Sequence, residues 1–587
     1  MSDRSQEMIL VTLLLRVSGL QQSCSLASRL LIWALICSLL LGLSACNSSD
    51  SEKSSVTLFG KVSSQEEGTM EGVLVSARPE QGNIAVTVVS DSRGEYAFPS
   101  GRLGKGRYKL SIRAFGYELP QMSEVEIVDG RSLHNDLRLR RTPDVSSQMS
   151  SAEWLISAPG TEQQKNQLYR CESCHSLGTV LGAHHTVQEW QVVLNRMQRW
   201  LPPSTEWSPL ATHALPPRKK TTETIEFAKY LASINAIEPN KWPFELHGFA
   251  RPKGKETRVI VTEFELSRPE SYPHDAIVGP DGRIWFNDFQ QPYIGVLDPG
   301  SGKIREWKLP VLRPKDPAGF LTIKFDKDGK AWIPRFMQGC TVTRFDPVTE
   351  KFTSWTVDPK YNNATSRCAH VALGAPSGKI WFSDSENRRM FRLNPTDGHI
   401  EAFNSFPQYH GRTGVVTDFH NSNQHRTYGI AVDSTGNGYF ADIAGGNIGR
   451  IDANTGAVTL YPTPTPNSGP RRMFMDSQDQ LWFGENYASK LGMFDTHTRR
   501  IQEWTPSVPW AGCYPAVRDK QGDVWTAGMS TDLVYRLNPS TGEFMQYLLP
   551  TLGANIRKVD ADSSASVPAI WVAEVHRGKI AKVEPQE

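Results

Sequence analysis

A repeated unit fills the C-terminal half of this 587-residue chain and constrains its fold more than any other feature. Examples are PHDAIVGPDGRIWFNDF, YGIAVDSTGNGYFADI and PRRMFMDSQDQLWFGEN, each followed by two more short alternating segments. Four short strands per unit, separated by Asp-Gly, Thr-Gly or equivalent turns, are typical of a β-propeller blade. One aromatic residue opens the core of each second strand, which predicts seven blades anchored by Trp285, Trp332, Trp381, Tyr439, Trp482, Trp525 and Trp571.

The two ends of the repeat predict how the ring closes. The last unit, AIWVAEVHRGKIAKVEP, contains only three strands, whereas an extra segment of the fourth-strand type, Val261 to Leu266, precedes the first unit. Pairing these two strands would leave the ring without a free edge. We therefore expect residues 261–587 to form a seven-bladed β-propeller that is closed by an N-terminal strand.

A smaller all-β segment covers residues 55–141. Short alternating runs separated by glycine-containing turns give about seven strands, the proportions of a small β-sandwich. The order GVLVSA, TVVSDSRGEYAF, GKGRYKLSIRAFGY resembles the carboxypeptidase regulatory-like domain over Val56 to Arg140. The resemblance implies a spacer or adhesion unit, and we assign it no catalysis.

The segment between the two β regions, residues 152–237, has helical periodicity and contains RCESCHSLG. Cys171 and Cys174 with His175 directly after them are compatible with a redox dithiol, half of a zinc site, or the two thioether anchors of a covalent haem c whose iron takes His175 as its first axial ligand. No second cysteine pair completes a zinc site, and no thioredoxin-like alternation of strand and helix surrounds the motif. These observations favour the haem.

The order of helix, motif and further helices resembles a small class I c-type cytochrome over the same all-α segment. Such a domain needs a second axial ligand, and Met197 is the only methionine between His175 and Ile237. The run HHTVQEWQVVLNRM resembles the short cytochromes attached to periplasmic dehydrogenases, in which the methionine binds the iron. His184, His185 and His213 are the alternatives.

The N-terminus has the pattern expected of an export signal. Arg29 precedes the apolar run Leu30 to Leu43, which is followed by small residues. Leu43, Ser44, Ala45 and Cys46 resemble the lipobox of bacterial lipoproteins, which implies residues 1–46 as signal peptide with its lipobox and a membrane anchor through a lipid on Cys46, facing the periplasm or cell exterior. An uncleaved membrane anchor is the alternative. The 64 basic and 62 acidic residues give no reason to expect a nucleic acid partner.

Two sets of positions are expected to line one face of the propeller. The residue eleven before an anchor and the residue three after it give the pairs His274 with Asp288 and His370 with Asp384, both at a spacing of fourteen. We interpret these four as the catalytic candidates, because a carboxylate beside a histidine suits acid/base chemistry. Further carboxylates of the second set are candidates for a divalent cation such as Mg²⁺: Asp442, Glu485 and Glu574. Solvated loop residues that recur because the blade recurs are the alternative.

The repeat region resembles the virginiamycin B lyase family, streptogramin-opening enzymes built as seven-bladed propellers, over Val261 to Glu587. The resemblance implies a magnesium-dependent C–O lyase that uses a Pro-His in the first strand of the last blade and a glutamate fourteen residues later. This chain keeps Glu574 there but has GANIRKVD where the histidine should lie.

Three functions remain open from the sequence. The first is an exported, lipid-anchored c-type haem protein that passes electrons to a periplasmic partner while its propeller binds or oxidises a small molecule. The second is a magnesium-dependent lyase with an accessory cytochrome, and the third is a non-catalytic scaffold that docks a redox partner. The first explains why a haem motif and a propeller share one chain.

Overall fold

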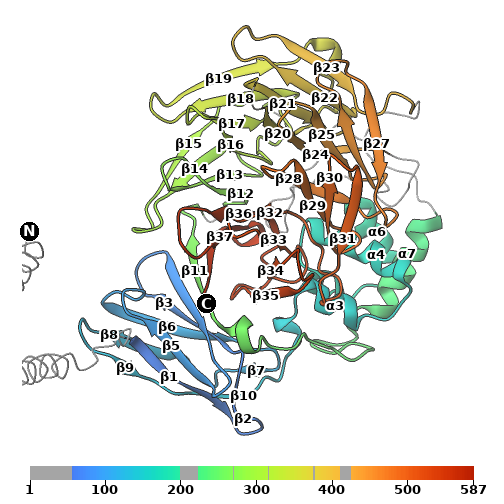
Figure 1. Cartoon of the computed structure of the whole chain (residues 1–587). Helices are drawn as coiled ribbons and strands as arrows, with labels where there is room; N and C mark the ends of the chain where they lie inside the picture. The colour runs from blue at the N-terminus through green and yellow to red at the C-terminus, as the bar shows by residue number, and fades with distance from the viewer. Residues whose placement is uncertain are drawn as a thin grey trace, which may run out of the picture. The chain divides into compact units, whose positions relative to one another are not determined.

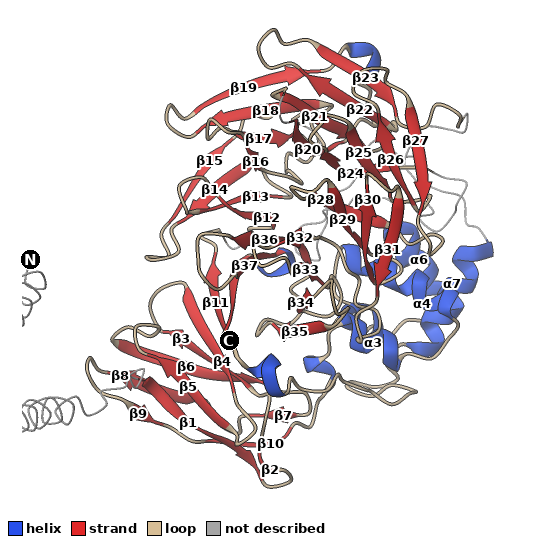
Figure 2. Ribbon diagram, in the orientation of Figure 1, coloured by secondary structure: helices blue, strands red, loops and turns tan. Residues whose placement is uncertain are grey.

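The computed structural model describes residues 56–197, 222–268, 270–314, 316–374, 377–409 and 425–586, and residues 56–587 form one compact unit. The chain is mainly β, with one short helical region (Figures 1 and 2). Within the described ranges, no helix is long and apolar enough to cross a membrane.

Residues 273–404 form the first three of seven similar antiparallel sheets. Each sheet has four strands that follow one another in space as in sequence. Sheet 1 contains β12 (Pro273–Val278), β13 (Ile284–Asp288), β14 (Tyr293–Leu297) and β15 (Ile304–Lys308). Sheet 2 contains β16 (Lys324–Phe325), β17 (Ala331–Pro334), β18 (Thr341–Asp346) and β19 (Lys351–Thr356). Sheet 3 contains β20 (Cys368–Gly374), β21 (Lys379–Asp384), β22 (Arg389–Leu393) and β23 (Ile400–Asn404).

The next three sheets repeat this order over residues 427–548. Sheet 4 contains β24 (Thr427–Val432), β25 (Gly438–Asp442), β26 (Asn447–Ile451) and β27 (Val458–Pro462). Sheet 5 contains β28 (Pro470–Met475), β29 (Gln480–Glu485), β30 (Lys490–Asp495) and β31 (Arg500–Trp504). Sheet 6 contains β32 (Val517–Arg518), β33 (Val524–Ala527), β34 (Leu533–Leu537) and β35 (Phe544–Leu548).

Sheet 7 takes its fourth strand from the other end of the repeat. It contains β36 (Ile556–Asp562), β37 (Ala569–Glu574) and β38 (Lys579–Pro585), and β11 (Val259–Glu265) pairs antiparallel with β38 along its whole length. The extra segment expected at 261–266 therefore lies in this sheet.

The anchor aromatics hold neighbouring sheets together. Each is buried in an apolar cluster between its own sheet and the next, and Trp571 of sheet 7 packs with Ala276 and Phe286 of sheet 1. Several also donate to an aspartate in the preceding hairpin turn, for example Trp525 Nε1 to Asp519 Oδ2 at 2.7 Å. This bond explains why an aspartate and an aromatic recur together in the units.

A disulfide between Cys340 and Cys368 joins sheets 2 and 3. Both cysteines are buried in the cluster between these sheets, whereas Cys513 is a buried free cysteine. The bond therefore reinforces one of the sheet contacts covalently.

The N-terminal module is a two-sheet sandwich over residues 56–141. One sheet has the order β2-β1-β10-β7, with β5 and β9 also pairing to β1, and the other runs β4-β3-β6-β8. The strands are β1 (Val56–Ser64), β2 (Gly68–Thr69), β3 (Leu74–Pro79), β4 (Ile84–Val89), β5 (Glu95–Pro99), β6 (Gly106–Arg113), β7 (Tyr117–Glu118), β8 (Ser123–Ile127), β9 (Leu133–His134) and β10 (Leu137–Arg141).

The second sandwich sheet continues into sheet 7. Strand β4 pairs antiparallel with β11, so one eight-stranded sheet runs β36-β37-β38-β11-β4-β3-β6-β8. The module that the sequence suggested as a spacer is thus hydrogen-bonded through its backbone to the propeller sheet. β11 has a partner strand on each side.

The helical region matches the periodicity of its sequence. It contains α3 (Ser151–Ser157), α4 (Glu162–Tyr169), α5 (Leu177–Leu181), α6 (Val187–Met197) and α7 (Thr222–Ile234), with short 3-10 turns η1 (Ser146–Gln148) and η2 (Arg170–Ser173). Capping boxes begin α3 at Ser150 and α4 at Thr161. Three further 3-10 turns lie elsewhere: η3 (Gly254–Thr257), η4 (Pro359–Tyr361) and η5 (Val575–Arg577).

Candidate functional site

The innermost strands share a bulge at the centre of the propeller. In sheet 1, two residues of β12 lie opposite one residue of β13, between the pairs Pro273–Asp288 and Ala276–Phe286. Strands β20, β24, β28 and β36 carry the same irregularity. We name the first bulged position and its equivalents the upper ring: His274, Leu321, Ala369, Tyr428, Arg471, Tyr514 and Arg557. The next position is the lower ring: Asp275, Thr322, His370, Gly429, Arg472, Pro515 and Lys558.

The rings correct one detail of the sequence interpretation. Counting back from the anchors places His370 at the same position as His274. The hairpin between β20 and β21 is one residue longer, so Ala369 takes the upper-ring position and His370 the lower. The equal spacing of the two predicted His–Asp pairs therefore conceals a one-residue shift in register.

Arg472 joins the lower ring into one hydrogen-bonded network. Its guanidinium forms an ion pair with Asp275 and donates to the Thr322 hydroxyl at 3.2 Å and to His370 Nδ1 at 3.1 Å. It also donates to the Leu321 carbonyl at 2.8 Å. Because Arg472 belongs to sheet 5 and its partners to sheets 1, 2 and 3, its side chain reaches across the centre.

The network gives the two histidines opposite hydrogen-bonding roles. His274 Nδ1 lies 3.0 Å from Asp275 Oδ1, and an ionised carboxylate only accepts, so Nδ1 carries the proton and Nε2 is an acceptor. His370 Nδ1 accepts from Arg472, so its Nε2 carries the hydrogen. Both Nε2 atoms are buried and have no hydrogen-bond partner among the described residues. The site thus offers a bound molecule one acceptor and one donor.

Burial sets the charge of these groups. It lowers the pKa of His274 to about 4 although the Asp275 carboxylate opposes the shift, and it lowers the pKa of His370 well below the ordinary histidine value. Burial also disfavours the ionised form of Asp275, but the Arg472 guanidinium outweighs it and holds the pKa of that carboxyl below its usual range. At neutral pH both histidines are neutral and Asp275 is ionised.

The aspartates predicted beside these histidines fix loops instead. Asp288 accepts from the backbone N–H of Gln290 at 2.8 Å and forms an ion pair with Arg268 at 2.7 Å. Asp384 accepts from the backbone N–H of Arg367 at 2.9 Å. The carboxylate next to the first histidine is the following residue in sequence, and the second histidine bonds to a threonine and an arginine.

The three carboxylates predicted to bind a divalent cation lie in three different sheets. Asp442 lies 2.7 Å from His425 Nδ1 and accepts from the Asn447 amide at 2.8 Å. Burial raises the pKa of Glu485 to about 8 and that of Glu574 far above its ordinary value, so both stay protonated at neutral pH. In the part of the chain that the structure describes, no three His, Cys, Asp or Glu side chains gather in a metal-binding geometry.

The Cys-x-x-Cys-His segment lies directly on the upper ring. The Ser173 carbonyl accepts from the Arg557 guanidinium at 2.9 Å, and the Glu172 carbonyl accepts from the Asn555 amide at 3.4 Å. The Glu172 carboxyl accepts from the Ser530 hydroxyl at 2.7 Å, and burial raises its pKa to about 8. The helical region therefore docks on the propeller beside sheets 4 to 7 (Figure 1).

The two motif cysteines do not have the character of a redox dithiol. They are not bonded to each other, and the protein packed around them raises the pKa of both thiols, that of Cys171 to about 12. A reactive dithiol needs a lowered pKa. His175 Nδ1 lies 3.4 Å from the Ser176 carbonyl, which leaves Nε2 as its free ring nitrogen.

The predicted second axial ligand, Met197, is the last residue of α6 and is half-buried. Of the alternatives, His184 Nδ1 lies 2.7 Å from the Ala236 carbonyl, and the His185 ring packs edge-on against Trp190. His213 lies outside the described residues.

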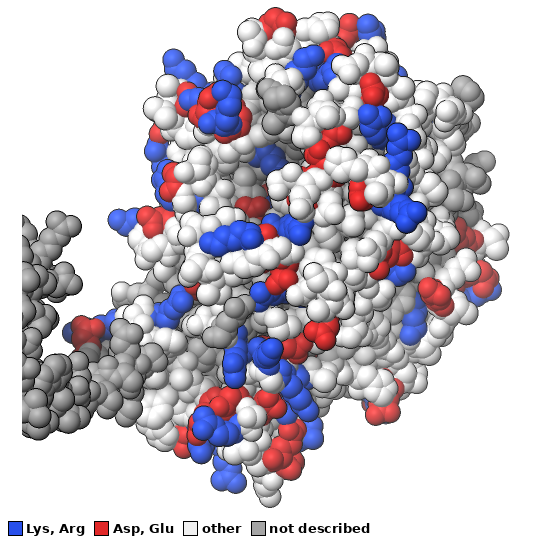
Figure 3. All heavy atoms as spheres, viewed as in Figure 1, with Lys and Arg blue, Asp and Glu red and all other residues white. Residues whose placement is uncertain are grey.

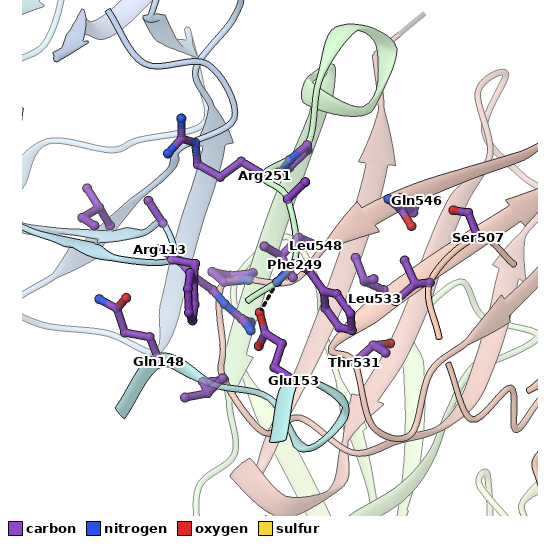
Figure 4. A pocket seen from close by; sticks show the side chains of 18 of the residues that line it. Arg113, Gln148, Glu153, Phe249, Arg251, Ser507, Thr531, Leu533, Gln546 and Leu548 are labelled. Atoms are coloured by element: carbon purple, nitrogen blue, oxygen red, sulfur yellow. Dashed lines mark hydrogen bonds between the residues drawn. The ribbon is translucent and has the colours of Figure 1, made fainter. Parts of the chain in front are cut away.

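A cavity of about 450 Å³ lies away from this chemistry, where the N-terminal module, the linkers and sheet 6 meet (Figure 4). Its charged groups already have partners: Arg113 pairs with Asp532 at 2.9 Å, and Glu153 accepts from the Phe249 N–H at 2.8 Å. We interpret it as a junction between domains.

Sequence reasoning missed Asp275, Arg472 and Arg557. A signal was present, because Arg471-Arg472 occupies in sheet 5 the two positions that His274-Asp275 holds in sheet 1. This equivalence is found by aligning the first residues of the innermost strands, and not by counting back from the anchors.

Two family models match parts of the chain. Residues 415–587 match the virginiamycin B lyase family, and residues 57–140 match the carboxypeptidase regulatory-like domain. These matches support a lyase-like propeller fold and the nature of the N-terminal module. No curated protein sequence matches the chain.

Among solved structures, the chain is similar to selenomethionine-substituted virginiamycin B lyase from Staphylococcus aureus, with 23% identity and a TM-score of 0.47 over 56% of this chain and 99% of that one. It is also similar to a structure of streptogramin B lyase, with 22% identity and a TM-score of 0.47 over the same shares of the two chains.

Proposed function

We propose that this chain is an exported c-type haem protein whose propeller binds a small molecule and whose haem takes electrons from it. The observation that supports this most is the contact between the Cys-x-x-Cys-His segment and the propeller, made through Arg557 of the upper ring and through Ser530 and Asn555 beside it. A group attached to this segment lies next to any molecule held at the ring. Such proximity is what electron transfer between them needs.

The residues of the segment fit a covalent haem. Cys171 and Cys174 are free thiols able to form the two thioether bonds, and His175 keeps Nε2 for the iron. We propose Met197 as the second ligand, because it is the one methionine of the segment after the motif. When bound, the haem supplies one-electron chemistry, and its ligands set the potential.

The propeller residues supply proton chemistry beside it. His274 Nε2 accepts a proton from a bound molecule, and Asp275 fixes the tautomer and stabilises the imidazolium that results. His370 Nε2 donates a hydrogen bond to an oxygen of the same molecule. Loss of a proton to His274 makes the bound molecule easier to oxidise.

The proposal includes the organisation expected from the sequence. The propeller is closed by β11, and a lipid on Cys46 anchors the chain outside the cytoplasm, where a partner accepts the electrons. The disulfide between Cys340 and Cys368 supports the export, because such bonds persist in oxidising compartments.

A lyase reaction is less well supported. In the last blade, the position equivalent to His274 is Arg557, preceded by Ile556, and an arginine is a poor general base because its pKa lies above about 12. The catalytic Pro-His of the lyase family is therefore missing from the blade in which that family uses it.

The first experiment tests haem attachment. The full chain, produced by export in a host that matures c-type cytochromes, should keep its haem through acid–acetone treatment, whereas C171A/C174A should lose it. C513A removes the third free cysteine and should keep the haem. Extraction of the haem from the wild-type chain would end the proposal.

A second experiment tests the distal ligand. Met197→Ala should abolish the weak far-red absorption band of sulfur-ligated ferric haem and change the potential. An unchanged spectrum in this variant, together with an altered one in His184→Ala or His185→Ala, would transfer the role to a histidine.

A further inference from the structure

Two arginines of the upper ring, Arg471 and Arg557, have no acidic partner among the described residues. Elsewhere in the propeller, Arg472 pairs with Asp275, whereas the buried Arg335 donates to a backbone carbonyl. A guanidinium that is buried without a counter-charge is costly. Their positions therefore point to a negative charge that the chain itself does not supply.

Arg557 is 4% exposed and bonds only to neutral acceptors. Its Nε donates to the Asn555 side-chain oxygen at 2.7 Å, and a terminal nitrogen donates to the Ser173 carbonyl at 2.9 Å. Its guanidinium also lies 5.5 Å from the centre of the Phe289 ring. These contacts orient the group and leave its charge uncompensated.

Arg471 lies among aromatic rings. Its guanidinium is 4.9 Å from the centre of the Tyr514 ring and 5.6 Å from that of Tyr428, and the two tyrosine hydroxyls bond to each other at 2.5 Å. It donates to the Asn486 side-chain oxygen at 3.2 Å, while its Nε has no hydrogen-bond partner within the described ranges. Tyr514, in sheet 6, lies between the two arginines in ring order.

The side of the upper ring formed by sheets 1 to 3, which begins beside Arg557, is apolar. Phe289 stacks on Tyr272 at 5.9 Å, contacts Phe336 at 5.7 Å and lies edge-on to the His274 ring at 4.8 Å. Tyr272 is 4% exposed, and its hydroxyl, like His274 Nε2, has no hydrogen-bond partner in the described part of the chain. Leu321, Met337 and Ala369 complete this buried cluster.

We propose that a small aromatic carboxylate binds at the upper ring, with its carboxylate facing Arg557 and Arg471 and its ring against the Phe289 cluster. A carboxylate matches the planar fork of a guanidinium with two parallel hydrogen bonds, and aromatic rings pack favourably against one another. His274 Nε2 then lies beside the ring as an acceptor for a substituent hydroxyl. This deepens the proposed function by naming its substrate class, but the binding itself does not need the haem.

The test uses benzoate as the probe, titrated into the full chain by calorimetry, with the neutral benzamide as comparison. Benzoate should bind at least about tenfold more tightly than benzamide, a difference of about 1.4 kcal/mol. Arg557→Gln and Arg471→Gln should each weaken benzoate by a similar factor. Arg518→Gln, which removes an arginine paired with Asp476 in an outer turn, should leave the affinity unchanged.

Because Arg557 is buried, its substitution could also affect folding, so a second variant with a smaller change is tested beside Arg557→Gln. Phe289→Leu should weaken benzoate but not acetate, since only the aromatic contact is lost. Equal binding of benzoate and benzamide, no binding of benzoate, or equal competition by inorganic phosphate would each overturn the proposal. C171A/C174A should still bind benzoate. If the wild-type chain binds benzoate but carries no covalent haem, the proposed redox function is wrong and the carboxylate site stands.

Discussion

At the scale of single residues, the hydrogen-bonding roles at the propeller centre depend on which ring nitrogen of His274 and of His370 carries the proton. His274 and His370 differ because one donates to a carboxylate and the other accepts from Arg472. Substitution of Asp275 would therefore have two effects. The tautomer of His274 would no longer be fixed, and Arg472 would lose its counter-charge.

The burial of neutral His274 predicts a loss of stability in acid. The unfolded histidine binds a proton near pH 6.5, whereas folded His274 does so only near pH 4, so unfolding is favoured as the pH falls through this window. Relative to His274→Gln, the wild-type chain should lose up to about 3 kcal/mol between these values, from about 1.36 kcal/mol per pKa unit. Denaturant unfolding at several pH values measures it.

His399→Gln is the control, because His399 lies exposed on a turn. Its stability should follow that of the wild type across the same pH range. A His274→Gln variant with the same acid sensitivity as the wild type would show that this histidine is protonated when folded.

At this scale, sequence reasoning identified His274 as a candidate but missed the residue to which its ring is hydrogen-bonded. His274 was identifiable from its place before an anchor, but its carboxylate partner is Asp275, whereas Asp288 pairs with Arg268. The bulge places two successive residues of β12 opposite one residue of β13, and the spacing from the anchor does not reveal this pairing. Arg557 could not be identified from spacing, because an insertion lengthens the hairpin between β36 and β37.

At the scale of elements, the repeat was readable because each blade uses the same local devices. An aspartate in the turn, an aromatic in the second strand and a glycine at a positive φ angle recur, and the aromatic then fills the space between two sheets. Strands β16 and β32 are only two residues long. Sheets 2 and 6 are therefore recognised in the sequence more from the repeats on either side than from their own strand pattern. The disulfide had no signal in sequence.

The disulfide predicts a measurable share of propeller stability. Closing a loop between Cys340 and Cys368 restricts the unfolded chain, so C340A/C368A should lose about 2–4 kcal/mol. Thermal unfolding with and without a reductant measures this. The wild type should unfold at a lower temperature when reduced, whereas the double variant should not respond to the reductant; equal responses would contradict the prediction.

At the scale of the whole molecule, one buried acid links the haem-binding segment to the propeller. Folded Glu172 keeps its proton up to about pH 8, whereas a free glutamate releases it near pH 4.3, so docking weakens as the pH rises between these values. Glu172→Gln should remove this dependence. Hydrogen exchange of residues 170–175, corrected for its intrinsic pH dependence, should speed up from pH 5 to 8 in the wild type alone.

Glu162→Gln, on the exposed start of α4, should behave as the wild type. If segment 170–175 exchanges equally fast in wild type and Glu172→Gln at pH 9, Glu172 does not control the docking. Basic and acidic side chains are interspersed on the face shown in Figure 3.

The continuous sheet through β11 sets an order of assembly. During synthesis, β4 and β11 are available long before β38, so the N-terminal module can hold β11 in register while the blades between them are made. When the last blade is made, β38 can pair with β11, which is already hydrogen-bonded to β4. Replacing the module by an unrelated domain would therefore slow folding of the propeller, even if every blade were unchanged. It would also leave the edge of β11 exposed, where strands of other chains can pair with it.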